Sequence, residues 1–289
     1  MSQLTRRTFT LGSLALSGII QNIRSPVLAQ TATPAASGLP SLEITLTDDG
    51  FELPDGIRAG RYEFAASNTG TMTMSHFGIG KFPDEVTEQD IEAFFAAQGE
   101  DTEALSFDDI AFVGAADWPQ PGQPAVTGVI DLQPGRYIAF KPLEEEEPVR
   151  FTVEGKFSAA VEPAADLTVT LREMTIDLPE TAFTSSPMRW KIEKPGAIHH
   201  EVSVLAVPPE FDADTFMMLM SLPEDATPPP GTPEFEYQPV AAIGILASGG
   251  TSWLDVQLEP GHYMATCMLP FGTGYPHAMD GMFVFFDVT

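Results

Sequence analysis

Residues 267–288 read CMLPFGTGYPHAMDGMFVFFDV, a loop rich in Gly and Pro that leads into an apolar strand. The stretch begins with Cys267, the only cysteine of the 289-residue chain. Nine residues separate Cys267 from His277, and four separate His277 from Met282. One loop therefore carries a thiol, an imidazole and a thioether, which are donors that soft transition metals prefer.

The sequence just before this loop occurs twice in the chain. Residues 255–266 (DVQLEPGHYMAT) match residues 129–140 (VIDLQPGRYIAF) at an offset of 126. Two further similar segments begin at Leu42 and Leu167, 125 residues apart, and each reaches Leu-Pro at its twelfth residue. A period of this length indicates duplicated domains, because the repeats of solenoid proteins are much shorter.

Each copy consists of short alternating strands separated by Gly, Pro and Asn, a pattern typical of all-β proteins. We predict two tandem antiparallel β-sandwiches, at 41–155 and 166–289, with a linker at 156–165. The strands expected in the second copy are 168–171, 189–193, 200–207, 252–258, 262–267 and 282–288.

Each copy also contains one predicted helical insertion. In the first copy it is TEQDIEAFFAAQGE (87–100), where Thr87 can cap the helix and Asp90 lies three residues further on. In the second copy it is DADTFMMLMSL (212–222), begun by Asp212 or Asp214.

The N-terminal sequence predicts export. Thr5-Arg6-Arg7-Thr8-Phe9 is a twin-arginine pattern, and the apolar stretch 11–20 that follows is short for a membrane span. We expect residues 1–29 to be a twin-arginine signal cleaved near Ala29, and residues 30–40 to be a flexible leader. The mature protein would be periplasmic or extracellular with no integral membrane span, or membrane-anchored if the signal stays uncleaved.

The charge balance limits the possible partners. The chain has a formal net charge of -27, with 41 acidic residues against 14 Lys and Arg. Such a surface repels nucleic acid and anionic lipid and favours a cationic partner. A single cysteine forms no internal disulfide, so in an oxidising compartment Cys267 needs protection by burial or by a metal.

Two adjacent histidines, His199 and His200, precede an apolar strand upstream of Cys267. Side chains alternate along a strand, so His200 shares a face with Val202, Val204 and Ala206. His199 shares the opposite, more polar face with Glu201, Ser203 and Leu205. We expect the inward-pointing His200 to join Cys267, and His199 is the alternative.

The order His200, Cys267, His277, Met282 resembles that of the cupredoxin family, the type 1 copper domains of plastocyanin, azurin and copper nitrite reductase. The resemblance implies two Greek-key β-sandwiches and one type 1 copper. Cys267 would be its thiolate, His200 and His277 its imidazoles, and Met282 its axial ligand. It covers residues 166–289 with ligands and 41–155 as a fold alone. The nine-residue gap is longer than in small electron carriers and closer to that of copper nitrite reductase.

The first copy lacks this donor set. His76 aligns with Glu201, Lys141 stands where Cys267 stands, and Glu144–Glu147 replaces the loop that carries His277. We expect no copper there. His76 is interpreted as a structural histidine with satisfied hydrogen bonds, and the acidic run as a solvated turn.

The leading functional hypothesis is an exported electron-transfer protein with a redox partner that the sequence does not identify. A metal-free binding module is one alternative, and copper storage or delivery with the same ligands is another. A copper oxidase or nitrite reductase is less favoured, because Thr266 and Met268 flank Cys267 and no His-Cys-His segment is present. We therefore expect a carrier rather than an enzyme.

Overall fold

A computed structural model describes residues 38–73, 76–97, 101–141, 148–158, 161–180, 183–223, 226–233, 235, 237–270 and 275–289. The predicted signal (1–29), nearly all of the leader (30–40) and the acidic run Glu144–Glu147 lie outside these ranges. Within them no helix is long and apolar enough to cross a membrane.

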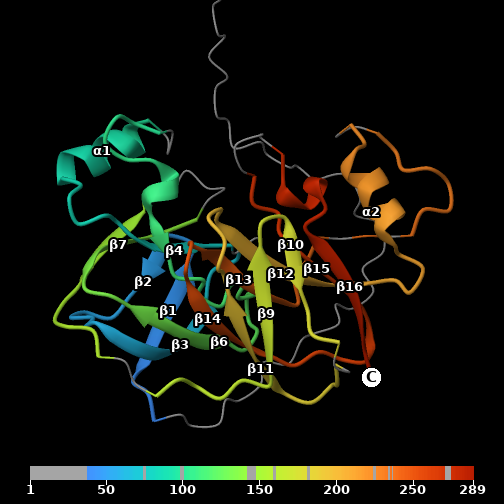
Figure 1. The fold of residues 1–289 in the computed structure, drawn as a ribbon, viewed down its shortest axis with the longest axis horizontal. Coiled ribbons are helices and arrows are strands. Elements are labelled where there is room, and N and C mark those ends of the chain that lie inside the picture. Colours follow the sequence, from blue (N-terminus) through green and yellow to red (C-terminus); the bar gives the residue numbers. More distant parts are fainter. Residues whose placement is uncertain are drawn as a thin grey trace, which may run out of the picture.

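Strands make up most of the regular secondary structure of the described residues, as the sequence predicts (Figure 1). The first half, residues 41–155, holds β1 (Ser41–Thr47), β2 (Gly50–Glu52), β3 (Gly60–Asn68), β4 (Gly78–Lys81), β5 (Ala111–Phe112), β6 (Val126–Leu132), β7 (Gly135–Phe140) and β8 (Val149–Val153). The second half, residues 166–289, holds β9 (Leu167–Arg172), β10 (Thr175–Asp177), β11 (Met188–Glu193), β12 (His200–Val207), β13 (Ala241–Leu246), β14 (Thr251–Val256), β15 (Gly261–Thr266) and β16 (Phe283–Val288).

Two short α-helices lie at opposite sides of the molecule (Figure 1). Helix α1 (Glu88–Ala96) begins as expected, because Thr87 and Asp90 form a capping box. Helix α2 (Ala213–Met220) is capped by Asp212, whose carboxylate accepts the Thr215 amide. Two single-turn 3-10 helices, η1 (Phe107–Asp109) and η2 (His277–Asp280), complete the helical elements of the described residues.

Eight strands form one sheet in the order β10-β9-β11-β14-β6-β3-β1-β2. Four-stranded sheets, β5-β4-β7-β8 and β13-β12-β15-β16, form the second layer of each half. Most neighbours are antiparallel, but β1 with β3 and β9 with β11 are parallel. The predicted all-β sandwich fold is confirmed, but these two pairs are not antiparallel as expected, because the chain leaves each β-hairpin (β1–β2, β9–β10) and crosses to the other side of its first strand.

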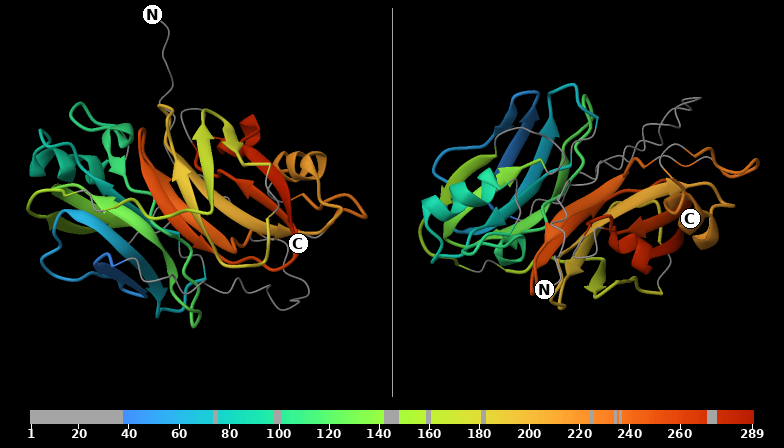
Figure 2. Two further views of the ribbon diagram at one scale, coloured as in Figure 1. Left: turned by 60° about the horizontal axis from the view of Figure 1, so that its bottom comes forward. Right: turned by 90° about the horizontal axis from the view of Figure 1, so that it is seen from above.

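The two halves join edge to edge. Strands β14 and β6 pair antiparallel, with Trp253 opposite Val129 and Leu254 opposite Gly128. In the other layer, isolated bridges link Val113 with Leu246 and Ala116 with Ile243. Figure 2 shows the blue-green first half beside the yellow-red second half.

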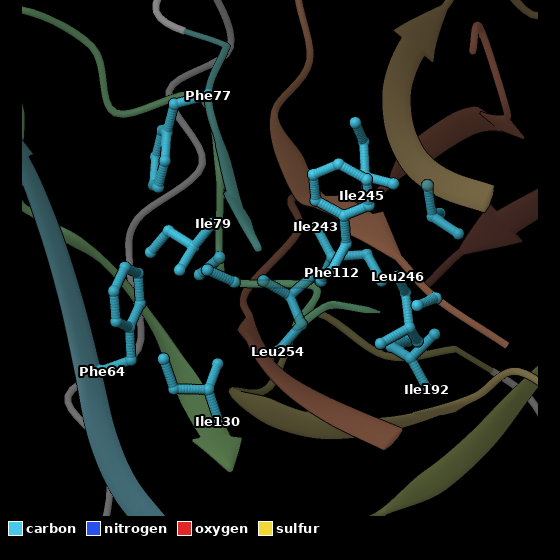
Figure 3. Packing of buried hydrophobic residues seen from close by; sticks show 14 of the residues in the cluster. Phe64, Phe77, Ile79, Phe112, Ile130, Ile192, Ile243, Ile245, Leu246 and Leu254 are labelled. Atoms are coloured by element: carbon cyan, nitrogen blue, oxygen red, sulfur yellow. The ribbon is translucent and has the colours of Figure 1, made fainter. Parts of the chain in front are cut away.

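One buried apolar cluster runs through both halves. Figure 3 shows Phe64, Phe77, Ile79 and Ile130 of the first half near Ile192, Ile243, Ile245, Leu246 and Leu254 of the second. A smaller cluster lies beneath α2 and includes Phe211, Phe216 and Met264, with Met217 and Met220 packed against it. Because apolar burial is the main favourable term in folding, the shared cluster stabilises the halves as one body.

Two strands of the second half are absent from the predicted set. Strand β10 has only three residues, and β13 has the sequence AAIGIL, which shows no polar alternation. All of β13 except Ala241 is buried, so both of its faces are covered and the period-2 signal is lost.

Candidate metal centre

Three donor side chains meet at one end of the second half. The Sγ atom of Cys267 lies 3.4 Å from Nδ1 of His277 and 3.9 Å from Nδ1 of His200. The two Nδ1 atoms are 3.0 Å apart. All three residues are buried, and their donor atoms lie within 4.8 Å of one another.

This spacing fits a single metal ion. Tetrahedral or trigonal sites place nitrogen at about 2.0–2.1 Å and sulfur at about 2.3 Å from zinc, so donors sharing such an ion lie about 3–4 Å apart. Two imidazoles with one thiolate are the in-plane donors of blue copper sites. The geometry therefore fits a copper ion, and Cys267, His200 and His277 are the residues that would hold it.

Backbone hydrogen bonds close the loop that carries two of these donors. The Cys267 amide donates to the Met282 carbonyl at 3.1 Å, and the Cys267 carbonyl accepts the Ala278 amide at 2.9 Å. The His277 amide donates to the Leu269 carbonyl at 3.2 Å. Residues 271–274 of this loop lie outside the described residues. The bonds on either side fix Cys267 and His277 relative to each other.

Met282 follows η2 and immediately precedes β16. It is completely buried, its amide donates to the His277 carbonyl, and its own carbonyl accepts the Cys267 amide. Gly281 precedes it with φ of +92°, a left-handed conformation that glycine adopts without strain. The structure thus places Met282 beside the donor cluster through main-chain contacts.

His200 opens β12, and its ring lies 4.8 Å from the His277 ring at an interplanar angle of 75°. His199 points elsewhere: its ring makes edge contacts with Phe107 and Phe112 of the first half at 6.1 and 5.4 Å. Of the two neighbours, His200 is the one brought to Cys267.

The two faces of β12 differ from the sequence expectation. Ala206 is exposed rather than inward, whereas Glu201, Ser203 and Leu205 are buried. The first half and α2 cover the face that the sequence marks as more polar, so alternation alone did not separate inside from outside here.

The ionisation states suit metal binding at neutral pH. Burial, with the charges of His277 and Lys194, lowers the pKa of His200 to about 3. Burial also lowers the pKa of His277. Burial and the carboxylate of Glu201 raise the pKa of the Cys267 thiol well above its ordinary value. Near pH 7 the imidazoles are neutral donors, and a metal that binds Cys267 must displace its proton.

Two charged residues near His200 carry no signal in the sequence. Glu173 accepts the Ala197 amide at 2.5 Å and lies against Gly196, where a Cβ would meet its carboxylate at 2.1 Å. Lys194 is almost completely buried and lies near Glu173, which partly offsets the lowering of its pKa by burial. No motif marks either residue, because their positions depend on how the β9–β10 hairpin meets the segment before His200.

The remaining histidines lie away from the donor cluster. His262, for which the sequence predicts no role, contacts Asp287 at 2.7 Å at the opposite end of β15 from Cys267. His76 of the first half does have polar partners, as a structural histidine would, namely Asp117 and Glu201. Lys141, which aligns with Cys267, is buried.

No protein-family model and no curated protein matches this chain. Among solved structures, it is similar to dithionite-reduced auracyanin from Roseiflexus castenholzii, with 20% identity, 43% of this chain and 95% of that chain covered, and a TM-score of 0.30. The chain is also similar to auracyanin A, a "blue" copper protein from Chloroflexus aurantiacus, with 16% identity, 42% of this chain and 99% of that chain covered, and a TM-score of 0.27. A third similar structure is the azurin Az-iso2 from Methylomonas sp. strain J, with 16% identity, 42% of this chain and 95% of that chain covered, and a TM-score of 0.26. These likenesses span less than half of this chain.

Proposed function

We propose that this chain is an exported electron-transfer protein that holds one type 1 copper. The Cys267 thiolate, the Nδ1 atoms of His200 and His277 and the Met282 thioether would hold it. The observation that carries the proposal is the gathering of one buried thiol and two buried imidazole nitrogens within 4.8 Å.

The chain contributes a rigid and dry set of donors. Backbone hydrogen bonds hold the Cys267 and His277 segments, and β12 holds His200. When bound, copper would supply a one-electron couple, and the soft thiolate of Cys267 and the thioether of Met282 would tune its potential. A site that barely moves on gaining or losing an electron suits a carrier.

Burial favours retention of the metal over delivery. His277 is 1% exposed and the other two donors are completely buried, so metal exchange requires the loop to open. A protein that hands its copper to another benefits from exposed donors. Storage or delivery is therefore the weaker use of these ligands.

Domain organisation, export and partner belong to the same proposal. The large sheet has the same strand order when it is followed inward from either edge: β10, β9, β11, β14 from one edge and β2, β1, β3, β6 from the other. Each second-half strand of this sheet thus corresponds to one strand of the first half. This order supports duplicated domains at 41–155 and 166–289. The twin-arginine pattern supports export, and the net charge of -27 supports a cationic redox partner.

A copper titration tests the proposal. One equivalent of Cu(II) is added to the purified protein and to Cys267→Ser, and visible absorption is recorded before and after dialysis against a mild chelator. We expect an intense charge-transfer band and one retained copper per chain in the wild type, and no such band in Cys267→Ser. Far-ultraviolet circular dichroism checks that the variant folds. A band that survives in Cys267→Ser, or a colourless wild type that loses its copper, would refute the proposal.

A further inference from the structure

A chain of charged side chains links the first half to the donor cluster, and its two carboxylates, Asp117 and Glu201, are buried. Nδ1 of His76 contacts the carboxylate of Asp117, which is 1% exposed. On its other side, Nε2 of His76 lies 3.4 Å from the carboxylate of Glu201 on β12. The His76 ring also stacks on Trp118 at 5.9 Å. The imidazole is thus held between two carboxylates, one from each half.

Asp117 is held firmly in place. Its Oδ1 accepts the Phe77 amide at 3.0 Å and the Trp118 amide at 2.7 Å. Its other oxygen faces His76. A carboxylate with these fixed partners orients the ring and stabilises its charged form.

Glu201 connects this chain to two donor segments. It directly follows His200, and its Oε1 accepts the amide of Met268, which directly follows Cys267, at 3.1 Å. One side chain therefore ties the backbone beside one donor to the backbone beside another. Glu201 is buried, and a buried carboxylate is stable only when it is paired and hydrogen-bonded.

We propose that His76, held by Asp117, is a positioning residue of the metal centre: it fixes the carboxylate of Glu201, so that Glu201 holds the Met268 amide and the Cys267 segment in place. This inference rests on the proposed function and gives the first half a part in the centre. The position of His76 between two carboxylates also favours a positive charge on its ring. Burial opposes charge on His76, but Asp117 and Glu201 outweigh it and raise its pKa to about 9.

Two readouts separate positioning from a merely structural role. The first is the hydrogen-exchange rate of the Met268 amide in the metal-free protein, and the second is the rate at which copper is lost to a chelator from the loaded protein. The variants are His76→Gln, Glu201→Gln and the double variant, with His262→Gln as the matched control. His262 is also paired with a carboxylate but touches none of the three donors.

We expect His76→Gln to speed Met268 exchange and copper loss at least tenfold, and His262→Gln to change neither. Adding Glu201→Gln should largely rescue His76→Gln, because a neutral amide oxygen can still accept the Met268 amide without a counter-charge. Such non-additivity is the signature of two residues that act together. Unchanged Met268 exchange in His76→Gln, or an effect of equal size with and without Glu201→Gln, would overturn the proposal.

Two further outcomes are also decisive. If His76→Gln does not fold, the proposal requires that the double variant folds and behaves like Glu201→Gln. If the double variant does not fold either, His76 acts independently of Glu201 and the proposal is overturned. If the wild type takes up no copper, the proposed function fails, while the exchange data still report whether His76 positions Met268 through Glu201.

Discussion

His199 and His200 are adjacent but have different surroundings, and this difference is testable. We expect His200→Gln to abolish the copper charge-transfer band, because it removes a donor that lies 3.9 Å from Sγ of Cys267. His199→Gln should keep the band but lower the free energy of unfolding by about 1–3 kcal/mol, since it disturbs a buried polar group beside Phe107 and Phe112.

Visible spectra and denaturant titrations of both variants measure these effects. Loss of the band in His199→Gln with retention in His200→Gln would show that the choice between them is wrong.

Strand alternation could place His199 and His200 on opposite faces of β12, but it could not decide which face is covered, because both faces are buried near Cys267. The sequence could also not predict the partners of His199 or Glu201. Both contact the first half, at Phe112 and His76, and those contacts depend on how the halves meet. The same reason explains why the sequence analysis could interpret His76 as a structural histidine but could not predict its partners, Asp117 and Glu201.

Among the secondary-structure elements, the turn between η2 and β16 depends on Gly281. Its φ is +92°, and a Cβ there would meet nothing within 4 Å, so Gly281→Ala adds backbone strain without a clash. We expect a loss of about 1–2 kcal/mol in the free energy of unfolding and a shifted charge-transfer band, because Met282 directly follows the turn.

Gly249 provides the matched control. It lies in the β13–β14 turn at φ of +70°, and a Cβ on this residue would also meet nothing within 4 Å. Gly249→Ala should therefore cost a similar stability and leave the spectrum unchanged. Equal spectral effects of the two variants would contradict a specific role for the Gly281 turn.

The helices and most strands of the second half follow from local signals. Both helices are capped by the residues that their side-chain chemistry predicts: α1 by Thr87 with Asp90, and α2 by Asp212. Strand β13 was not predicted because it is covered on both faces and therefore shows no polar alternation. The parallel pairs were not predicted because strand direction depends on where the chain crosses the sheet.

At the scale of the whole molecule, the halves meet at the junction of β6 and β14, where there is no room for a side chain at Gly128. A Cβ at this residue would lie 2.2 Å from the Trp253 carbonyl oxygen. Gly128→Ala should force the strands apart and lower the free energy of unfolding by about 1–3 kcal/mol. Denaturant titration measures this, with Gly60→Ala as the control, since its Cβ would make an ordinary 3.7 Å contact. Equal losses in the two variants would argue against a tight junction.

The pH dependence of the metal-free protein should have two arms. The pKa of His200 is lowered to about 3, so the unfolded chain binds the extra proton below its ordinary pKa of about 6.5. Stability then falls from about pH 6.5 toward pH 3, by about 1.4 kcal/mol per pH unit for each such group. The pKa of His76 is raised to about 9, so its contribution is complete below about pH 6.5 and is lost as the pH rises through 9.

Denaturant unfolding between pH 4 and pH 10 measures both arms. His76→Gln should flatten the alkaline arm and leave the acid arm, and an alkaline arm that is unchanged in this variant would contradict the assignment. The sequence could not predict that the pKa of His200 is lowered and that of His76 raised. The first shift arises from burial, and the second from two carboxylates, Asp117 and Glu201, that come from different halves.

X-ray absorption at the copper edge, recorded on the protein loaded with one equivalent of copper, identifies the atoms that bind the metal. We predict one sulfur and two imidazole nitrogens in the inner shell, with the sulfur absent in Cys267→Ser. An inner shell of nitrogen and oxygen alone in the wild type would contradict the copper assignment, and Cys267 would then be a buried thiol that packs the core.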